Sequence, residues 1–226
     1  VMESVLDARE LPYSDDPNKE EISLDVFVEV VSQAMEGVEV LNENGIAHRD
    51  IKPDNILFND KGDKVKTKVI DRDLEGNTET LQKEMDKGVV RGTLPYMPVE
   101  SIVNLENTKQ QVLRLVHTGA TEQIKPRDAE QEVDAMDMMI GKIKDFKTAL
   151  LRIKEDASER GEDPVEAIER VNVKLDATKI DTFAFGIMIK EFLDDHYDNP
   201  FNIPADFDEL VRDMTHPVPG KRITVK

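Results

Sequence analysis

Three polar side chains of different chemistry lie within six consecutive positions of the chain. The segment 48–55 has the sequence HRDIKPDN. Asp50 could orient a hydroxyl group and accept its proton, and Lys52 could contact a phosphate. The amide oxygen of Asn55 could bind a hard cation such as Mg²⁺, and Asp71 offers a second oxygen ligand for the same point. These residue types could neutralise a triphosphate and assist transfer of its terminal phosphoryl group.

The elements that flank this segment follow from the hydrophobic pattern. Apolar residues recur at spacings of three and four from Leu24 onwards, which predicts an amphipathic helix over 24–44 that ends at Asn44-Gly45. Residues 56–58 and 65–70 predict two short strands joined by a polar turn. The segment HRDIKPDN therefore lies in a loop between a helix and a strand.

Much of the second half of the chain is predicted to be helical. An apolar stripe with steps of three and four indicates a long helix. Its residues are Val133, Met136, Ile140, Ile143, Phe146, Leu150 and Ile153. Pro164 suits the first turn of another helix. Residues 179–193 are apolar nearly all round, which indicates a buried helix, and residues 207–214 predict a last short helix.

Other parts of the chain show weaker patterns. Residues 1–6 are apolar and predict the end of a strand, whereas 7–21 are polar, contain two prolines and predict a loop. Residues 71–100 show no clear period and include the polar run 75–80. The pattern therefore predicts no particular element in that stretch.

The composition limits the class of protein. The chain has 226 residues, 38% of them apolar and 35% charged, so it is long enough for one globular domain with its own core. Its formal charge of −18 argues against a nucleic-acid partner or an anionic membrane surface, and no apolar run could span a membrane. The absence of Cys excludes disulfides and thiolate chemistry, and it suits a reducing, cytoplasmic location.

The segment HRDIKPDN resembles the catalytic loop of eukaryotic-type protein kinases, and its Lys52 is typical of the Ser/Thr type. Four other segments resemble motifs of the same family and follow in the same order. They are 69–71 (VID), 92–100 (GTLPYMPVE), 180–186 (IDTFAFG) and 219–224 (PGKRIT). The resemblance implies a mainly α fold of the α+β type, namely the C-terminal lobe of a kinase with a short β-hairpin beside the catalytic loop.

The same resemblance implies transfer of the ATP γ-phosphate to Ser or Thr hydroxyls of a protein substrate, and it assigns roles to single residues. Asp50 would be the catalytic base, and Lys52 would contact the transferring phosphate. Thr93 would position both residues near the acceptor hydroxyl. Asn55 and Asp71 would hold Mg²⁺.

The resemblance also places the nucleotide. Leu57 would lie beneath the adenine, and the backbone of Glu3 and Val5 would form the hinge that meets the adenine edge. On this interpretation the chain begins at the hinge, and the N-terminal lobe of the same protein lies upstream of Val1. We would then expect the isolated piece to be inactive or nearly so, with the missing lobe as its first partner.

Further residues would support the lobe or regulate it. Asp181 would brace the backbone of the catalytic loop, and Glu100 would form a buried ion pair with Arg222. Arg49 suggests a switch operated by a phosphate on the following loop, for which the threonines of the run 75–80 are the candidates.

The resemblance divides the chain into three parts. Residues 1–103 and 179–226 correspond to the kinase lobe, and residues 104–178 are interpreted as a helical insertion. The apolar stripe of this insertion is expected to pack within its own lobe. The alternative is that the insertion recruits a regulatory partner.

Two departures from the family pattern keep other functions open. Asp71-Arg72-Asp73 stands where the family has Asp-Phe-Gly, and the segment 195–204 leaves the usual docking helix missing or collapsed. One alternative is a pseudokinase that acts as a scaffold. Another is a kinase-fold enzyme with a small-molecule acceptor. The departures also suit a diverged kinase, located in a host cytosol if a microbe secretes it.

Overall fold

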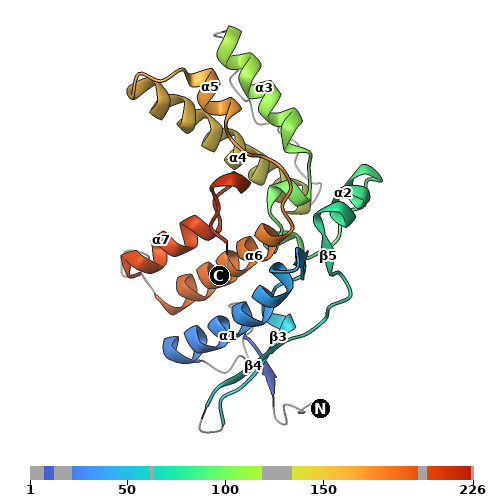
Figure 1. The fold of residues 1–226 in the computed structure, drawn as a ribbon. Helices are drawn as coiled ribbons and strands as arrows, with labels where there is room; N and C mark the ends of the chain where they lie inside the picture. The colour runs from blue at the N-terminus through green and yellow to red at the C-terminus, as the bar shows by residue number, and fades with distance from the viewer. Residues whose placement is uncertain (1–7, 13–21, 62–63, 119–133, 198–202, 225–226) are drawn as a thin grey trace.

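The protein is mainly helical and has two small antiparallel sheets in a computed structural model, as the sequence predicts (Figure 1). The structure describes residues 8–12, 22–61, 64–118, 134–197 and 203–224. The predicted strand end at 1–6, which includes Glu3 and Val5, lies outside these residues. Within the described parts of the chain, no helix is both long enough and apolar enough to cross a bilayer.

Helix α1 (Leu24–Asn42) forms where the spacing of apolar residues predicts it. Ser23 caps its first turn by accepting a hydrogen bond from the backbone N–H of Val26. Its buried face carries mostly branched apolar side chains together with Phe27. The chain leaves the helix through Gly45, whose φ of 70° lies in the left-handed region that glycine adopts without strain.

A three-stranded antiparallel sheet lies beside α1. Strand β3 (Ile56–Asn59) pairs with β4 (Lys66–Val69), so the predicted hairpin is confirmed. Strand β1 (Arg9–Glu10) pairs with the other edge of β3, which gives the order β1-β3-β4. The prediction of a loop throughout 7–21 is wrong for these two residues, because so short a strand shows no alternation of apolar and polar residues.

A second, two-stranded sheet joins the start of the catalytic loop to the segment before the next helix. It pairs β2 (Ile46–Ala47) with β5 (Gly76–Asn77). Single-turn 3-10 helices lie at Pro53–Asn55, Leu94–Tyr96, Val99–Ser101 and Pro219–Lys221.

Helix α2 (Thr78–Asp86) lies in the stretch for which no regular element is predicted. Asn77 caps it by accepting from the backbone N–H of Thr80. Leu81 is the one fully buried residue of this helix, so the helix has no apolar stripe that a sequence pattern could reveal.

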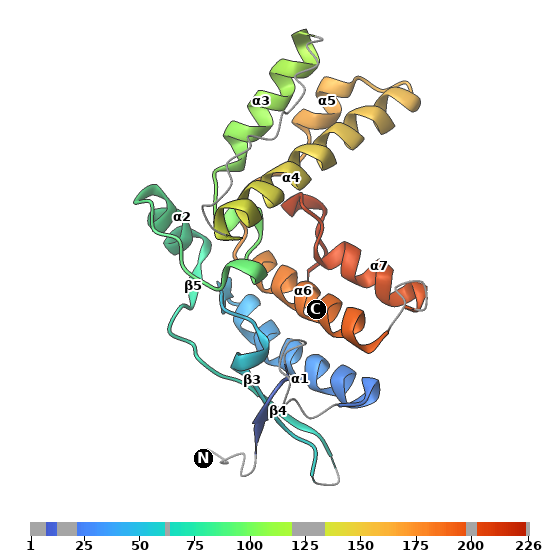
Figure 2. The ribbon, with the colours of Figure 1, turned by 180° about the vertical axis from the view of Figure 1, so that it is seen from behind.

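The first core is built around α6 (Thr178–His196), which is buried over most of its length. Helices α1 and α7 (Ala205–Met214) pack beside it, as both views in Figures 1 and 2 show. The rings of Phe27 and Phe192 stack with their centroids 3.6 Å apart. The predicted buried helix and the predicted last helix are therefore confirmed.

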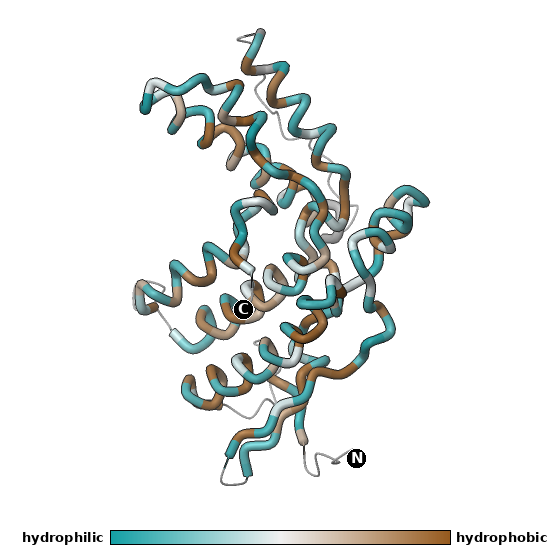
Figure 3. Tube along the Cα trace, in the orientation of Figure 1, coloured by the Kyte–Doolittle hydropathy of each residue, from teal (hydrophilic) through white to brown (hydrophobic). Residues whose placement is uncertain are grey.

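Three helices form a second core at the end of the molecule away from the β1-β3-β4 sheet (Figures 1 and 2). They are α3 (Leu105–Thr118), α4 (Asp134–Glu159) and α5 (Pro164–Glu169). The predicted stripe is buried at Phe146, Leu150 and Ile153, whereas Ile140 is 40% exposed. Apolar positions alternate with polar ones along these helices in Figure 3, as expected where only one face is covered. Val133 lies outside the described residues.

Close packing of α6 against the end of α7 requires a glycine. A Cβ added at Gly186 would lie 2.7 Å from Thr215 Cγ2 and 2.8 Å from Met214 Cβ. We expect Gly186→Ala to lower the free energy of unfolding by about 1–3 kcal/mol, because the two helices must move apart. Gly37→Ala is the matched control, since a Cβ on that exposed turn of α1 would meet nothing within 4 Å. Urea unfolding measures both variants, and equal effects would contradict the packing argument.

Candidate active site

The carboxylate of Asp50 is fixed by Thr93, which comes from a distant segment. Asp50 Oδ1 accepts hydrogen bonds from the backbone N–H of Thr93 at 3.0 Å and from its hydroxyl at 2.6 Å. Asp50 is buried, and Thr93 directly precedes the 3-10 helix Leu94–Tyr96. This contact holds the carboxylate in one orientation, as a group that must meet an incoming hydroxyl requires.

Asn55 and Lys52 complete the group around Asp50. The Asn55 side-chain nitrogen donates to the backbone carbonyl of Asp50 at 2.7 Å and to Asp50 Oδ2 at 3.1 Å. Lys52 Nζ lies 3.5 Å from Asp50 Oδ2 and 3.8 Å from Asp54 Oδ2. The turn Pro53–Asn55 folds these side chains together, so the loop brings an amine, an amide and a carboxylate to one place.

Asp71 reaches the same region through the backbone. The N–H of Ile70 donates to the carbonyl of Asn55 at 2.9 Å, which ties the residue before Asp71 to the catalytic loop. Asp71 has a φ of 59° in the left-handed region, and its side chain is exposed. Its carboxylate makes no hydrogen bond or ion pair with any residue that the structure describes. Asp71 therefore presents a carboxylate that no described residue engages, one residue after a backbone contact with Asn55.

The two residues after Asp71 point to solvent. Arg72 forms an ion pair with Glu75 and its side chain is 61% exposed, and Asp73 is also exposed. A charged guanidinium with a local carboxylate has no need to enter the core. The family pattern has an aromatic residue that packs inward at this position. This chain has Arg72 instead, which pairs with Glu75 at the surface.

Asp181 braces the catalytic loop from below. It is fully buried on α6 and accepts from the backbone N–H of His48 at 2.8 Å and from that of Arg49 at 2.9 Å. Burial raises the pKa of Asp181 to about 7, although these two hydrogen bonds favour the charged form. The predicted brace is confirmed, and it fixes the loop immediately before Asp50.

The side chain of His48 is a second brace, directed toward the strand that precedes Asp71. Its Nε2 lies 2.9 Å from the carbonyl oxygen of Ile70. Burial lowers the pKa of His48, so its neutral ring donates to this carbonyl. The two braces together connect α6, the catalytic loop and β4.

Arg49 holds helix α2 against the catalytic loop. Its side chain is 7% exposed, and its Nη2 lies 2.5 Å from Glu84 Oε2. Arg91 Nε lies 3.6 Å from Glu84 Oε1, so Glu84 is shared by two arginines. Arg49 thus already has an anionic partner, Glu84, in the place where the sequence predicts a regulatory phosphate. Sequence reasoning missed this contact, because nothing in the spacing of Arg49 and Glu84 relates them.

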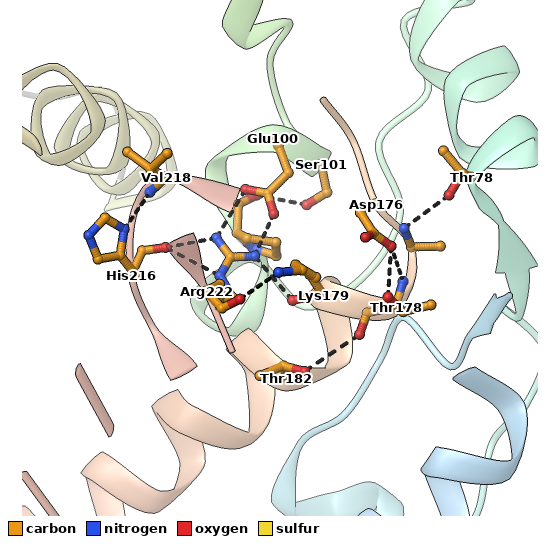
Figure 4. A network of polar contacts seen from close by, with 12 residues as sticks. Thr78, Glu100, Ser101, Asp176, Thr178, Lys179, Thr182, His216, Val218 and Arg222 are labelled. Atoms are coloured by element: carbon orange, nitrogen blue, oxygen red, sulfur yellow. Dashed lines mark hydrogen bonds and ion pairs between the residues drawn. The ribbon is translucent and has the colours of Figure 1, made fainter. Parts of the chain in front are cut away.

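Glu100 and Arg222 form a buried ion pair, as predicted. The two guanidinium nitrogens Nη1 and Nη2 of Arg222 lie 2.5 Å and 3.3 Å from the carboxylate oxygens of Glu100. Arg222 also donates to the carbonyls of His216 and Lys179, which satisfies its remaining N–H groups (Figure 4). The pair joins the segment that follows Thr93 to the C-terminal part of the chain.

The structure thus groups Asp50, Lys52, Asn55 and Thr93 and brings the chain to Asp71 beside them. Leu57 lies half-buried on β3, two residues after Asn55 and opposite Lys68 of β4. Glu3 and Val5, the predicted hinge contacts of the nucleotide, lie outside the described residues.

Asp181→Asn tests the lower brace. The amide nitrogen of Asn cannot accept a hydrogen bond, so one backbone N–H of the catalytic loop loses its partner. We therefore expect the free energy of unfolding to fall by about 1–3 kcal/mol. The folded pKa of Asp181, about 7, lies above its ordinary value of 3.8. The native carboxyl therefore holds its proton more tightly, and its contribution to stability falls as the pH rises between these two values.

The variant lacks this titration. Its stability deficit relative to the natural protein should therefore be larger at about pH 5 than at about pH 8, as measured by urea unfolding. A deficit that is the same at both values would show that Asp181 is ionised throughout this range, contrary to the raised pKa.

Glu84→Gln tests the contact between α2 and the catalytic loop. We expect the free energy of unfolding to fall by about 1–3 kcal/mol, because the buried guanidinium of Arg49 loses its carboxylate. Glu79→Gln on the same helix is the matched control. Glu79 pairs only with Lys83 on the exposed face, so its loss should leave stability unchanged. Thermal unfolding of the two variants compares them, and equal midpoints would refute the role of Glu84.

Part of the chain is similar to known protein kinases. The family described as "Protein kinase domain" matches residues 2–113. A protein of Acanthamoeba polyphaga mimivirus named as a serine/threonine-protein kinase is 30% identical over 99 residues, which cover 44% of this chain and 34% of the relative. A Bifidobacterium longum protein named as a serine/threonine-protein kinase is 33% identical over 109 residues, 46% of this chain and 14% of the relative.

A third relative comes from a vertebrate. Inhibitor of nuclear factor kappa-B kinase subunit alpha of Gallus gallus is 35% identical over 82 residues, 34% of this chain and 10% of the relative. The matched stretches thus span about a third or less of these relatives. Two residues beyond the matched range contact it: Asp181 holds the backbone of the loop, and Arg222 pairs with Glu100. The chain belongs to the eukaryotic-type protein kinase family.

Proposed function

We propose that the protein transfers the γ-phosphoryl group of ATP to Ser or Thr hydroxyls of a protein substrate. The observation that carries the proposal is the orientation of the Asp50 carboxylate, which Thr93 holds from one side and Asn55 from the other. Oδ2 of Asp50, which Asn55 and Lys52 approach, remains able to accept a further proton. The group is therefore built to meet a hydroxyl.

The reaction needs little covalent chemistry from the protein. As the hydroxyl oxygen of the substrate forms its bond to the γ-phosphorus, its proton passes to Asp50. The bond from the γ-phosphorus to the bridging oxygen breaks, and its electron pair leaves with ADP. The ammonium of Lys52, 3.5 Å from Asp50, supplies positive charge where negative charge develops.

The donor chemistry fits Mg²⁺. The Asn55 side-chain nitrogen is used by Asp50, which leaves its oxygen for a cation, and the Asp71 carboxylate is not engaged by the described residues. Among those residues, no three His, Cys, Asp or Glu side chains gather closely enough to hold a metal. Asn55 and Asp71 would therefore share the ion with phosphate oxygens and water, which is the usual arrangement for Mg²⁺. When bound, the ion would neutralise the triphosphate.

The preference for Ser or Thr in a protein rests on similarity. Lys52 and Thr93 match the Ser/Thr type of the family, and two of the relatives are named as serine/threonine-protein kinases. Thr93 could position Asp50 near the acceptor hydroxyl, because both its backbone and its hydroxyl contact the Asp50 carboxylate.

The test measures phosphate transfer from radiolabelled Mg-ATP to the protein itself and to a generic basic protein, using the whole gene product that contains this chain. We expect Asp50→Asn to lower kcat at least about 100-fold, because the proton acceptor is lost. Asp71→Asn should abolish transfer at ordinary Mg²⁺ concentrations. Asp156→Asn, an exposed position on α4, is the matched control and should leave transfer unchanged.

The same experiment addresses the second candidate, a pseudokinase. The exposed Arg72–Glu75 pair and Asp73 are the observations that favour it, since they replace the inward-packing part of the motif. Nucleotide that binds in an Mg²⁺-dependent manner without transfer to any protein would overturn the proposal in favour of a pseudokinase. Transfer only to small hydroxyl compounds would instead indicate a non-protein acceptor.

A further inference from the structure

A cavity of about 210 Å³ lies where the second core meets α6, and Asp50 is not among the residues that line it. Its walls come from α4, α6, the turn Val99–Ser101 and the segment after α7. Phe183, Ile187 and Pro217 give it an apolar surface. Lys142 brings a primary amine, and Asp145 and Arg222 are the other charged residues of the lining. The cavity is smaller than the pockets of about 300–1,000 Å³ that hold drug-sized ligands. A single ring or a short chain is therefore the size of ligand that it suits.

Lys142 is the unusual group in this cavity. Its Nζ donates to the carbonyl of Pro95 at 3.1 Å and lies 4.9 Å from the centroid of the Phe183 ring. No carboxylate of the described residues lies within 4.0 Å of it. Burial lowers the pKa of Lys142 to about 8, although the nearby charges of Glu100 and Asp145 favour its protonated form.

Arg222 also lies over the Phe183 ring, but its N–H groups are already hydrogen-bonded. Its guanidinium lies 5.0 Å from the Phe183 centroid, but it is bound by Glu100 and by the His216 carbonyl (Figure 4). Arg222 therefore has no free capacity for a ligand. The ammonium of Lys142 contacts one carbonyl and one aromatic face, so it can still donate a hydrogen bond to a ligand.

We propose that this cavity binds a small amphipathic carboxylate, with its anionic group on Lys142 and its apolar body against Phe183, Ile187 and Pro217. The carboxylate would accept a charge-assisted hydrogen bond from Lys142. The apolar body would replace water on the aromatic and aliphatic wall. Neither Asp50 nor any other residue of the proposed transfer site takes part, so this site does not depend on the proposed function.

Phenylacetate is the probe, and isothermal titration calorimetry on the whole gene product measures its dissociation constant. We expect Lys142→Met, which keeps the length of the side chain, to weaken binding at least about tenfold. Lys144→Met, an exposed lysine of the same helix, is the matched control and should bind as tightly as the natural protein. Phenylacetamide, the uncharged analogue, should bind at least about tenfold more weakly than phenylacetate.

A pH series provides a test that needs no variant. Above about pH 8 the affinity of the natural protein for phenylacetate should fall by about tenfold per pH unit, because Lys142 loses its proton. The charged groups that face Lys142 are Asp145, Glu100 and Arg222. Burial lowers the pKa of His216, so its ring is already neutral in this range.

Three results would overturn the proposal. They are no saturable binding of phenylacetate, equal binding of phenylacetate and phenylacetamide, and equal affinity of a folded Lys142→Met variant. If that variant does not fold, an affinity that is constant across the pH series would overturn the proposal in its place.

Discussion

The catalytic loop depends on one buried carboxylate. Asp181 lies on the most buried helix of the molecule and accepts the backbone N–H groups of two consecutive loop residues. Consecutive N–H groups converge on one anion only where the backbone departs from the extended form, and Arg49 does so with a φ of 73°. A loop has no ladder of hydrogen bonds to hold such a conformation. The carboxylate below it supplies the fixed points instead, and Asp50 follows directly.

A second interaction joins the two cores of the protein. Val99 and Val218 belong to the core of α3, α4 and α5. Glu100 directly follows Val99, and Arg222 lies four residues after Val218. On the other side, Arg222 lies over Phe183 of α6. A buried ion pair of this kind adds little net stability by itself, but the loss of one partner leaves an isolated charge in the core. The pair therefore fixes how the two cores meet.

Strong local patterns made much of the fold predictable from the sequence. The regular spacing along α1 and the apolar length of α6 identify both helices without any tertiary information. Helix α2 could not be found, because packing through Leu81 and the Glu84–Arg49 contact stabilises a segment without a stripe. The placement of Thr93 against Asp50 came from resemblance to a family, since no local pattern relates residues so far apart.

Large sequence separations in the site affect the order in which the protein folds. Asp181 lies 133 residues after His48, and Arg222 lies 122 residues after Glu100. The entropy lost on closing a loop grows with its length, so these contacts form slowly in an extended chain. Helices α3, α4 and α5 pack on one another within both loops and bring their ends closer. We therefore expect the three helices to form early and the catalytic loop to reach its native backbone among the last parts of the chain.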